Sequence, residues 1–228
     1  MIIRRMSSPK LWKFARKTKA RYAIAPKPGP HAKDACLPLG YILRDMLGIV
    51  ETACEARSLL NCKLVKVDGR VRKDIGFPVG LMDVLTIGDK HWRVLPGGRG
   101  LDLKPIDAAE SKLKLLKVIG KTHVKGKTQV NFHDGRNMLV NRDVYKTSDV
   151  ALYDVVENAV KGHVQFKRGT LVLIADGVNR GKVGRVEDIV VLRSPQPNRI
   201  VVKCDKESIE TLKKFAFAIG QDKPLIAL

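Results

Sequence analysis

The sequence predicts an α+β chain of several small modules behind a basic N-terminal extension. Two observations carry this prediction. The spacing of apolar residues changes from a helical period before Lys63 to a strand pattern after it. Clusters of Gly, Pro, Asn and Asp then divide the rest of the chain into short strands, which is typical of small β-barrels.

The predicted extension covers residues 1–36. Ten Lys and Arg side chains precede the first acidic residue, Asp34. Because like charges without counter-charges do not pack, we expect this arm to be disordered in free solution and to order on a polyanion. Trp12, Phe14 and Tyr22 lie among the charges and would suit stacking on nucleic-acid bases.

Two amphipathic helices are predicted at the start of the next segment. Apolar residues between Leu39 and Leu47 recur at three- and four-residue steps, which form one helix face. After Gly48, Thr52 and Glu55 have the spacing of a capping box, the side-chain arrangement that opens a helix. We therefore expect one helix before Gly48 and a short second helix after Thr52.

A basic β-hairpin is predicted after the helices. Residues 63–67 form a strand pattern, and Asp68 and Gly69 can supply the positive backbone angles of a tight turn. Residues 70–73 would then return as the second strand. Lysine and arginine side chains occur on both sides of the turn, so the hairpin would present cations.

A second strand pair, at residues 84–87 and 91–95, is predicted to complete this module. The following run, Pro-Gly-Gly-Arg-Gly at residues 96–100, reads as a linker. The second module is therefore expected to cover residues 37–100.

Short β-type runs continue to the end of the chain. In residues 101–165 they indicate a central β-barrel, and in residues 166–228 a second small barrel. The runs are 113–119, 128–132 and 150–156 in the first, and 170–174, 183–186, 189–192 and 199–202 in the second.

The charge balance predicts a polyanionic partner. The chain has 43 Lys and Arg residues against 23 Asp and Glu residues, a net charge of +20 and a pI near 10.0. Such values are typical of proteins that bind nucleic acid. The sequence has no apolar run long enough to span a bilayer and no pattern of a secretory signal. We therefore expect a cytoplasmic protein without a membrane partner.

No metal site is predicted from the four cysteines, Cys36, Cys54, Cys62 and Cys204. They form no Cys-x-x-Cys pair, and no histidine spacing completes a zinc site. We expect all of them to be buried thiols. We also expect no cofactor and no small-molecule substrate.

Residues 37–95 resemble the alpha-L RNA-binding domain. The order of two helices and a hairpin carries the resemblance, and residues 77–84 strengthen it. In that family the second helix and the hairpin present cations to the RNA backbone, since a rigid scaffold fixes their spacing against the phosphates. The corresponding cations of this chain are Arg44, Arg57, Lys63, Lys66, Arg70, Arg72 and Lys73. The alternative is that these side chains form a solvated charged surface.

Residues 167–186 resemble a KOW motif, which pairs a strand, a glycine-bearing loop and a second strand in an SH3-like barrel. Gly181 and Gly184 would let the backbone pass where a side chain would clash. The resemblance then leaves Asn179, Arg180 and Lys182 at an exposed loop tip. Many families of RNA-binding and protein-binding barrels carry this motif.

The order of these motifs and their flanks resembles the S4e family of small-subunit ribosomal proteins of archaea and eukaryotes. The flanking segments that match are residues 8–12, 25–31, 133–137 and 217–220. Asp176 stands where the family pattern has a glycine, a departure that affects the shape of the KOW loop and not the barrel. The chain also lacks the basic C-terminal extension of eukaryotic members, which favours an archaeal-type protein.

The resemblance implies a structural constituent of the small ribosomal subunit that binds ribosomal RNA and neighbouring ribosomal proteins. Binding would use the arm, the alpha-L lobe and the KOW barrel, mainly through phosphates and RNA shape. The residues expected to contact RNA are Arg4, Arg5, Lys10, Trp12, Lys13, Arg16, Lys17, Lys19, Arg21, Arg44, Arg57, Lys63, Lys66, Arg70, Arg72, Lys73, Arg136, Asn179, Arg180 and Lys182.

Two other classes of protein are alternatives to this interpretation. An RNA-modifying enzyme could carry an alpha-L module, but it needs a large catalytic domain, and only short strands follow residue 95. Asp134 and Asp143 are the loop aspartates that such an enzyme would use. A transcription or translation factor could use a KOW barrel, but a factor that must dissociate gains little from a ten-cation arm. We therefore expect no enzymatic activity.

Overall fold

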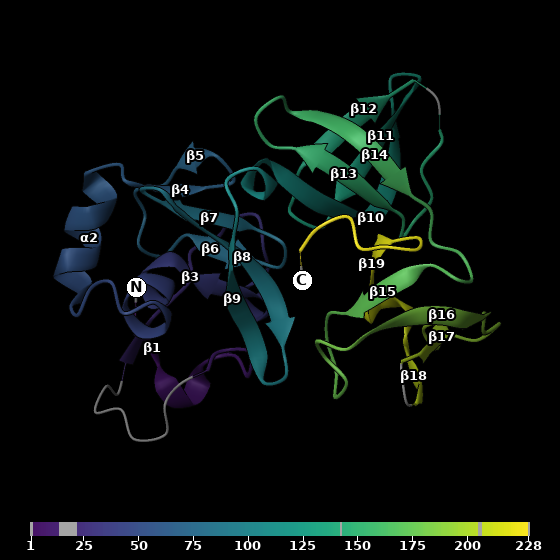
Figure 1. Ribbon diagram of the computed structural model, residues 1–228, viewed down its shortest axis with the longest axis horizontal. Helices are drawn as coiled ribbons and strands as arrows, with labels where there is room; N and C mark the ends of the chain where they lie inside the picture. Colours follow the sequence, from purple (N-terminus) through teal and green to yellow (C-terminus); the bar gives the residue numbers. More distant parts are fainter. Residues whose placement is uncertain (1, 14–21, 142, 205–206, 228) are drawn as a thin grey trace. The chain divides into compact units, whose positions relative to one another are not determined.

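The computed structural model describes residues 2–13, 22–141, 143–204 and 207–227 (Figure 1). The chain divides into two compact units, residues 1–112 and 113–228. Antiparallel β-sheets dominate both, and the helices are short. The α+β expectation is therefore corrected to a mostly β fold. None of the helices in these ranges is long and apolar enough to cross a membrane.

The first unit is built around a sheet of order β5-β4-β7-β8-β9, and β1–β2 and β3–β6 form two separate pairs. Its strands are β1 (Ile2–Arg4), β2 (Tyr22–Ile24), β3 (Cys36–Pro38), β4 (Val65–Val67), β5 (Arg70–Val71), β6 (Pro78–Gly80), β7 (Val84–Ile87), β8 (Lys90–Gly97) and β9 (Gly100–Ile106). Its helices are α1 (Leu39–Tyr41), continued by a π-helical segment (Ile42–Met46), and α2 (Ala53–Asn61).

Both predicted helices are present. In the first, the backbone N–H of Leu47 donates to the carbonyl of Ile42 at 2.9 Å, a five-residue step that widens the turn. At the start of α2, Thr52 Oγ1 accepts from the backbone N–H of Glu55 at 3.2 Å. The Glu55 carboxylate accepts from the N–H of Glu51 at 3.0 Å, one residue before the cap. The capping residues predicted from sequence therefore open α2.

The predicted hairpin is also confirmed. Asp68 and Gly69 have φ angles of 49° and 71°, as a tight turn between β4 and β5 requires. Asp68 Oδ1 accepts from the backbone N–H of Val84 at 3.0 Å, and the Asp68 N–H donates to the Val84 carbonyl at 2.9 Å. These bonds tie the turn to β7.

The run at residues 96–100 is a hairpin turn, so the prediction of a linker there was wrong. Gly97 pairs with Gly100, and β9 continues the same sheet to Ile106. A Cβ atom on Gly100 would lie 2.1 Å from the carbonyl oxygen of Leu11. The glycine is needed because the N-terminal segment packs closely against this turn, and not because the chain must be flexible.

The second unit contains two five-stranded antiparallel sheets, of order β12-β11-β10-β13-β14 and β18-β17-β16-β15-β19. The first consists of β10 (Leu113–Val124), β11 (Lys127–Phe132), β12 (Asn137–Val140), β13 (Val150–Asp154) and β14 (Ala159–Val164). The second consists of β15 (Leu171–Ile174), β16 (Val183–Val190), β17 (Arg199–Lys203), β18 (Ser208–Leu212) and β19 (Ala216–Gly220).

Bulges shape both sheets. In β10 the register shifts between Val118 and Gly120, so that its first half pairs with β13 and its second half with β11. The sequence predicted two strands in the region of β16, but β16 is one continuous strand with a register shift between Val186 and Asp188. Bulges increase the local twist of a strand, so both sheets are expected to twist more strongly at these positions.

Lys117 on β10 connects the two sheets of this unit. Its ammonium donates to the carbonyl oxygens of Lys214 at 2.8 Å and Ala216 at 2.7 Å. Burial, and secondarily Lys213, lowers the pKa of Lys117 to about 8. His133 packs edge-on against Phe217, with ring centroids 5.4 Å apart. Polar and aromatic contacts thus join the sheets.

The cysteines do not all follow the prediction of buried thiols. Cys36 is buried, and burial raises its pKa to about 12, with Asp34 and Asp83 adding to the effect. Cys204 is partly exposed, and Cys54 and Cys62 are exposed. Cys54 lies on the solvent-facing side of α2, and Cys62 is the residue just after this helix. The sequence prediction did not distinguish these exposed positions from the buried face of the helix.

Candidate nucleic-acid interface

The basic hairpin and the helix before it carry five exposed cations that the sequence predicted. In β4, Val65 and Val67 are buried and Lys66 between them is exposed, because side chains alternate across a sheet. The exposed members of the predicted set in this region are Arg57, Lys63, Lys66, Arg70 and Lys73. The bonds between Asp68 and Val84 hold the hairpin that carries three of them.

Two cations of the same predicted set are held by intramolecular contacts. The Arg72 guanidinium lies 4.3 Å from the centroid of the Phe77 ring. Arg44 donates to the carboxylate of Asp45 at 2.7 Å. Both side chains are partly covered, so they are less suited to phosphate contact than the exposed five.

Trp12 is a core residue and not an exposed stacking platform, which corrects the interpretation from sequence. Its side chain is 5% exposed and its ring stacks on Tyr41 with centroids 5.5 Å apart. Its indole N–H donates to the carbonyl of Cys36 at 2.8 Å. The Tyr41 hydroxyl donates to the carbonyl of Lys13 at 2.8 Å, and burial raises the pKa of Tyr41 to about 12.

The N-terminal arm is therefore docked in part, contrary to the expectation of a disordered tail. β1 pairs with β2, and Ala23 joins the core of the first unit. Of the predicted cations, Arg4 and Lys10 are exposed, Arg5 is half-buried, and Lys13 forms an ion pair with Asp102. Arg16, Lys17, Lys19 and Arg21 lie outside the described residues.

Arg136 belongs to a buried charge cluster. Asp134 accepts from Lys114 at 3.1 Å and pairs with Arg136 at 3.0 Å, and Lys114 is fully buried. Arg136 also lies 4.9 Å from the ring centroid of Tyr153. Burial alone would raise the pKa of Asp134, but Lys114, His133 and the Arg136 N–H together bring it below its usual range. The arrangement stabilises the central sheet.

The KOW-like loop differs from its prediction in what it exposes. Val178 at its tip is 100% exposed, whereas the Arg180 side chain is 13% exposed and folds back onto Asp176. Asn179 is half-buried, and Lys182 is exposed with its Nζ 3.8 Å from the Glu207 carboxylate. Arg180 is therefore not a free cation at an exposed tip. The reason is Asp176, which stands where the family pattern has glycine.

The glycines of this loop have different roles. Gly181 has a φ angle of 82°, which favours glycine. Gly184 lies in β16, where a Cβ atom would lie 2.6 Å from the carbonyl oxygen of Lys203. The expected close passage of backbone is thus present at Gly184.

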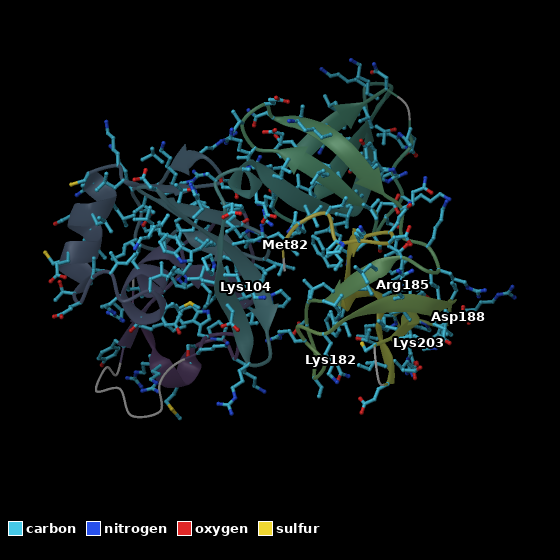
Figure 2. The ribbon with its side chains drawn as sticks, in the orientation of Figure 1. Met82, Lys104, Lys182, Arg185, Asp188 and Lys203 are labelled. Carbon is cyan, nitrogen blue, oxygen red and sulfur yellow. The ribbon has the colours of Figure 1, made fainter. Side chains whose placement is uncertain are left out.

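Sequence reasoning missed exposed cations on the C-terminal sheet. Arg185 and Lys203 are cross-strand partners on β16 and β17, and both are exposed (Figure 2). Lys167 and Arg168 line a shallow pocket together with Arg185. Strand alternation around Gly184 could have identified Arg185 and Lys203 as outward-facing residues.

The residues named for an enzymatic alternative form ion pairs. Asp134 bonds Lys114 and Arg136, and Asp143 pairs with Lys121. Among the residues in the described ranges, no group of three His, Cys, Asp or Glu side chains could hold a metal ion.

Comparison with known proteins identifies the family. A profile described as "Ribosomal family S4e" matches residues 88–160. Proteins named small ribosomal subunit protein eS4 from Methanosphaera stadtmanae and Archaeoglobus fulgidus are each 39% identical to this chain. The alignments cover 99% of this chain and 95% and 97% of the relatives, respectively.

A solved structure agrees with this comparison. The crystal structure of 30S ribosomal protein S4e from Thermoplasma acidophilum matches with a TM-score of 0.73 and 28% sequence identity. The match covers 83% of this chain and 97% of that one. These relatives are all named as ribosomal proteins. Identity over the whole chain, together with the fold, therefore shows that this chain belongs to the S4e family, the small ribosomal subunit proteins eS4.

Proposed function

We propose that this chain is a structural constituent of the small ribosomal subunit and binds ribosomal RNA through its exposed cations. The observation that carries the proposal is the group of exposed cations from α2 to β5, which stands on a scaffold held by hydrogen bonds. Rigid spacing of Lys and Arg suits contact with successive phosphates and releases condensed counterions. Neighbouring ribosomal proteins are the other expected partners.

The proposed modules are the arm (residues 1–36), an alpha-L RNA-binding domain, a central β-barrel domain and a KOW SH3-like barrel (166–228). The boundary between the alpha-L domain and the central domain moves from the expected residue 100 to residue 112, because β9 continues the first sheet to Ile106. Two helical segments followed by the β4–β5 hairpin support the alpha-L assignment. The loop between β15 and β16, with Gly184 packed against β17, supports the KOW assignment. The RNA-contacting set proposed from these modules is Arg4, Arg5, Lys10, Arg57, Lys63, Lys66, Arg70, Lys73 and Lys182, with Asn179 at the loop.

Replacing Lys66, Arg70 and Lys73 together with glutamine is expected to weaken binding to naked small-subunit ribosomal RNA. The plot of log K against log salt concentration has a negative slope, and each lost phosphate contact makes this slope shallower by about 0.7 to 0.9. The slope of the triple variant should therefore be shallower than that of the wild type by about 2. Filter binding across a salt series measures both quantities.

The matched control replaces Lys33, Lys90 and Lys104 with glutamine. These lysines are also exposed and lie in the same unit. Because both variants remove three cations, the change of net charge is identical. Equal losses in both variants would contradict a hairpin site and leave only a generic charge effect. Deleting the arm is a poorer test, because Trp12 and Ala23 belong to the core.

Washing purified small subunits in high salt separates the proposal from the alternative of a cycling factor. A structural constituent should stay with the subunit when the fractions are analysed by sedimentation. Release of the chain at a salt concentration that leaves the other ribosomal proteins bound would favour a transient factor.

A further inference from the structure

We propose that a pocket on the C-terminal sheet holds a single unpaired RNA base. The pocket has a volume of about 380 Å³ and lies between the loop after β15, strands β17 and β18, and the turn before β19. This volume is at the small end of the ~300–1,000 Å³ range of ligand pockets. The inference rests on the proposed RNA-binding function and adds a contact to a base.

Apolar side chains form the walls of the pocket. Phe215 is half-buried, Leu212 is partly buried, and Val178 is fully exposed beside them. The backbone N–H of Ala175 donates to the Phe215 carbonyl at 2.8 Å, which fixes the turn that carries the ring. A flat aromatic base would cover this apolar surface by stacking.

Gly177 gives the loop its backbone conformation beside the Phe215 ring. Its φ angle is 96°, a conformation that other residues rarely adopt. A Cβ atom built there would lie 3.6 Å from the ring, an ordinary van der Waals distance. The loop backbone therefore runs beside the ring and forms one side of the pocket.

Polar groups at the rim favour a base over an apolar peptide. Asn179 carries an amide with both donors and acceptors. Arg199 and Glu210, paired at 3.1 Å, add a donor and an acceptor. A base edge can form hydrogen bonds with the Asn179 amide, whereas an apolar segment offers it none and would cover the charged Arg199–Glu210 pair, at a cost in free energy.

Positive charge next to the pocket favours a nucleotide further. The Lys214 ammonium lies 5.0 Å from the centroid of the Phe215 ring, within the range of a cation–π contact. The Lys213 ammonium lies over a different ring, 5.5 Å from the centroid of Phe166, so Lys214 is the cation at Phe215. The whole chain carries a net charge of +20. Cations beside an aromatic wall are the combination found in single-strand binding sites, where they contact the phosphates.

The test uses the full chain and a short single-stranded RNA with one fluorescent adenine analogue. The same RNA paired with its complement is the second probe. Stacking on Phe215 should quench the fluorophore in the single strand and leave it unchanged in the duplex. Phe215→Leu, which keeps apolar volume but removes the ring, should abolish quenching and weaken single-strand binding about 5- to 100-fold.

Two controls keep the test specific. Phe215→Tyr retains the ring and should retain quenching. Val191→Ser changes a valine that is 68% exposed and does not line the pocket, so its binding should match the wild type. Thermal unfolding confirms that Phe215→Leu is folded.

Three results would overturn the proposal. The first is unchanged quenching and affinity in folded Phe215→Leu. If the hairpin triple variant still weakens binding, RNA-binding function stands and the base pocket alone falls. The second is equal quenching by single strand and duplex. The third is reduced incorporation of Phe215→Leu into small subunits without any change in RNA binding, which would assign the pocket to a protein partner.

Discussion

Replacing Trp12 with alanine is expected to lower the free energy of unfolding by about 3–5 kcal/mol. The ring is 5% exposed, stacks on Tyr41 and donates a hydrogen bond to the Cys36 carbonyl at 2.8 Å. The variant therefore loses buried apolar area and leaves a cavity and an unpaired carbonyl. Chemical denaturation measures the change.

Tyr22→Ala is the matched control for this prediction. Tyr22 is also an aromatic residue of the arm, but it is 56% exposed. A surface substitution of this kind should change stability by about 0.5 kcal/mol or less. Similar losses for Trp12→Ala and Tyr22→Ala, or no loss in either, would contradict a docked arm and restore the disordered tail expected from charge.

Replacing Asp134 with asparagine is expected to cost about 3–5 kcal/mol of unfolding free energy. The change removes the negative charge that lies 3.1 Å from the fully buried Lys114 ammonium. Adding Lys114→Met should recover part of the loss, because the buried positive charge is then removed as well. Denaturation of the two single variants and the double variant measures this coupling.

The effect of Asp134 should depend on pH. The folded-state pKa of this carboxyl lies below its ordinary value of 3.8, so its contribution is fully present above that pH. It is lost as the pH falls through the folded-state pKa. The stability difference between wild type and Asp134→Asn should therefore narrow in acid. A difference that grows on acidification would contradict the proposed direction.

An exposed pair provides the control for charge removal. Asp188 pairs with Arg168, and their side chains are 48% and 70% exposed. Since solvent screens such pairs, Asp188→Asn should cost at most about 1 kcal/mol. A loss as large as that of Asp134→Asn would show that burial of the Lys114 pair is not the cause.

Local chemistry was enough to predict several elements from sequence. The cap of α2 depends on Thr52 and Glu55, three residues apart, and the β4–β5 turn depends on Asp68 and Gly69. Such interactions involve neighbours in the chain, so the residues that form them can be read directly. The exposure of Lys66 follows from the alternation of side chains along β4.

Long-range contacts decided what the local patterns left open. Trp12 is buried because Tyr41 and Cys36, far along the chain, complete its environment. Gly100 marks close packing against Leu11 where composition indicated a linker. In both cases the partner is distant in sequence, so no local pattern could identify it.

The candidate site divides in the same way. The sequence by itself determined the charge of +20, the basic hairpin and the family resemblance. Only the tertiary structure decided that Arg180 folds onto Asp176, that Arg136 joins Lys114 and Asp134, and that Phe215 lines a pocket. The physical reason is that sequence fixes which charges exist, whereas folding fixes which of them are neutralised by partners and which remain exposed to bind.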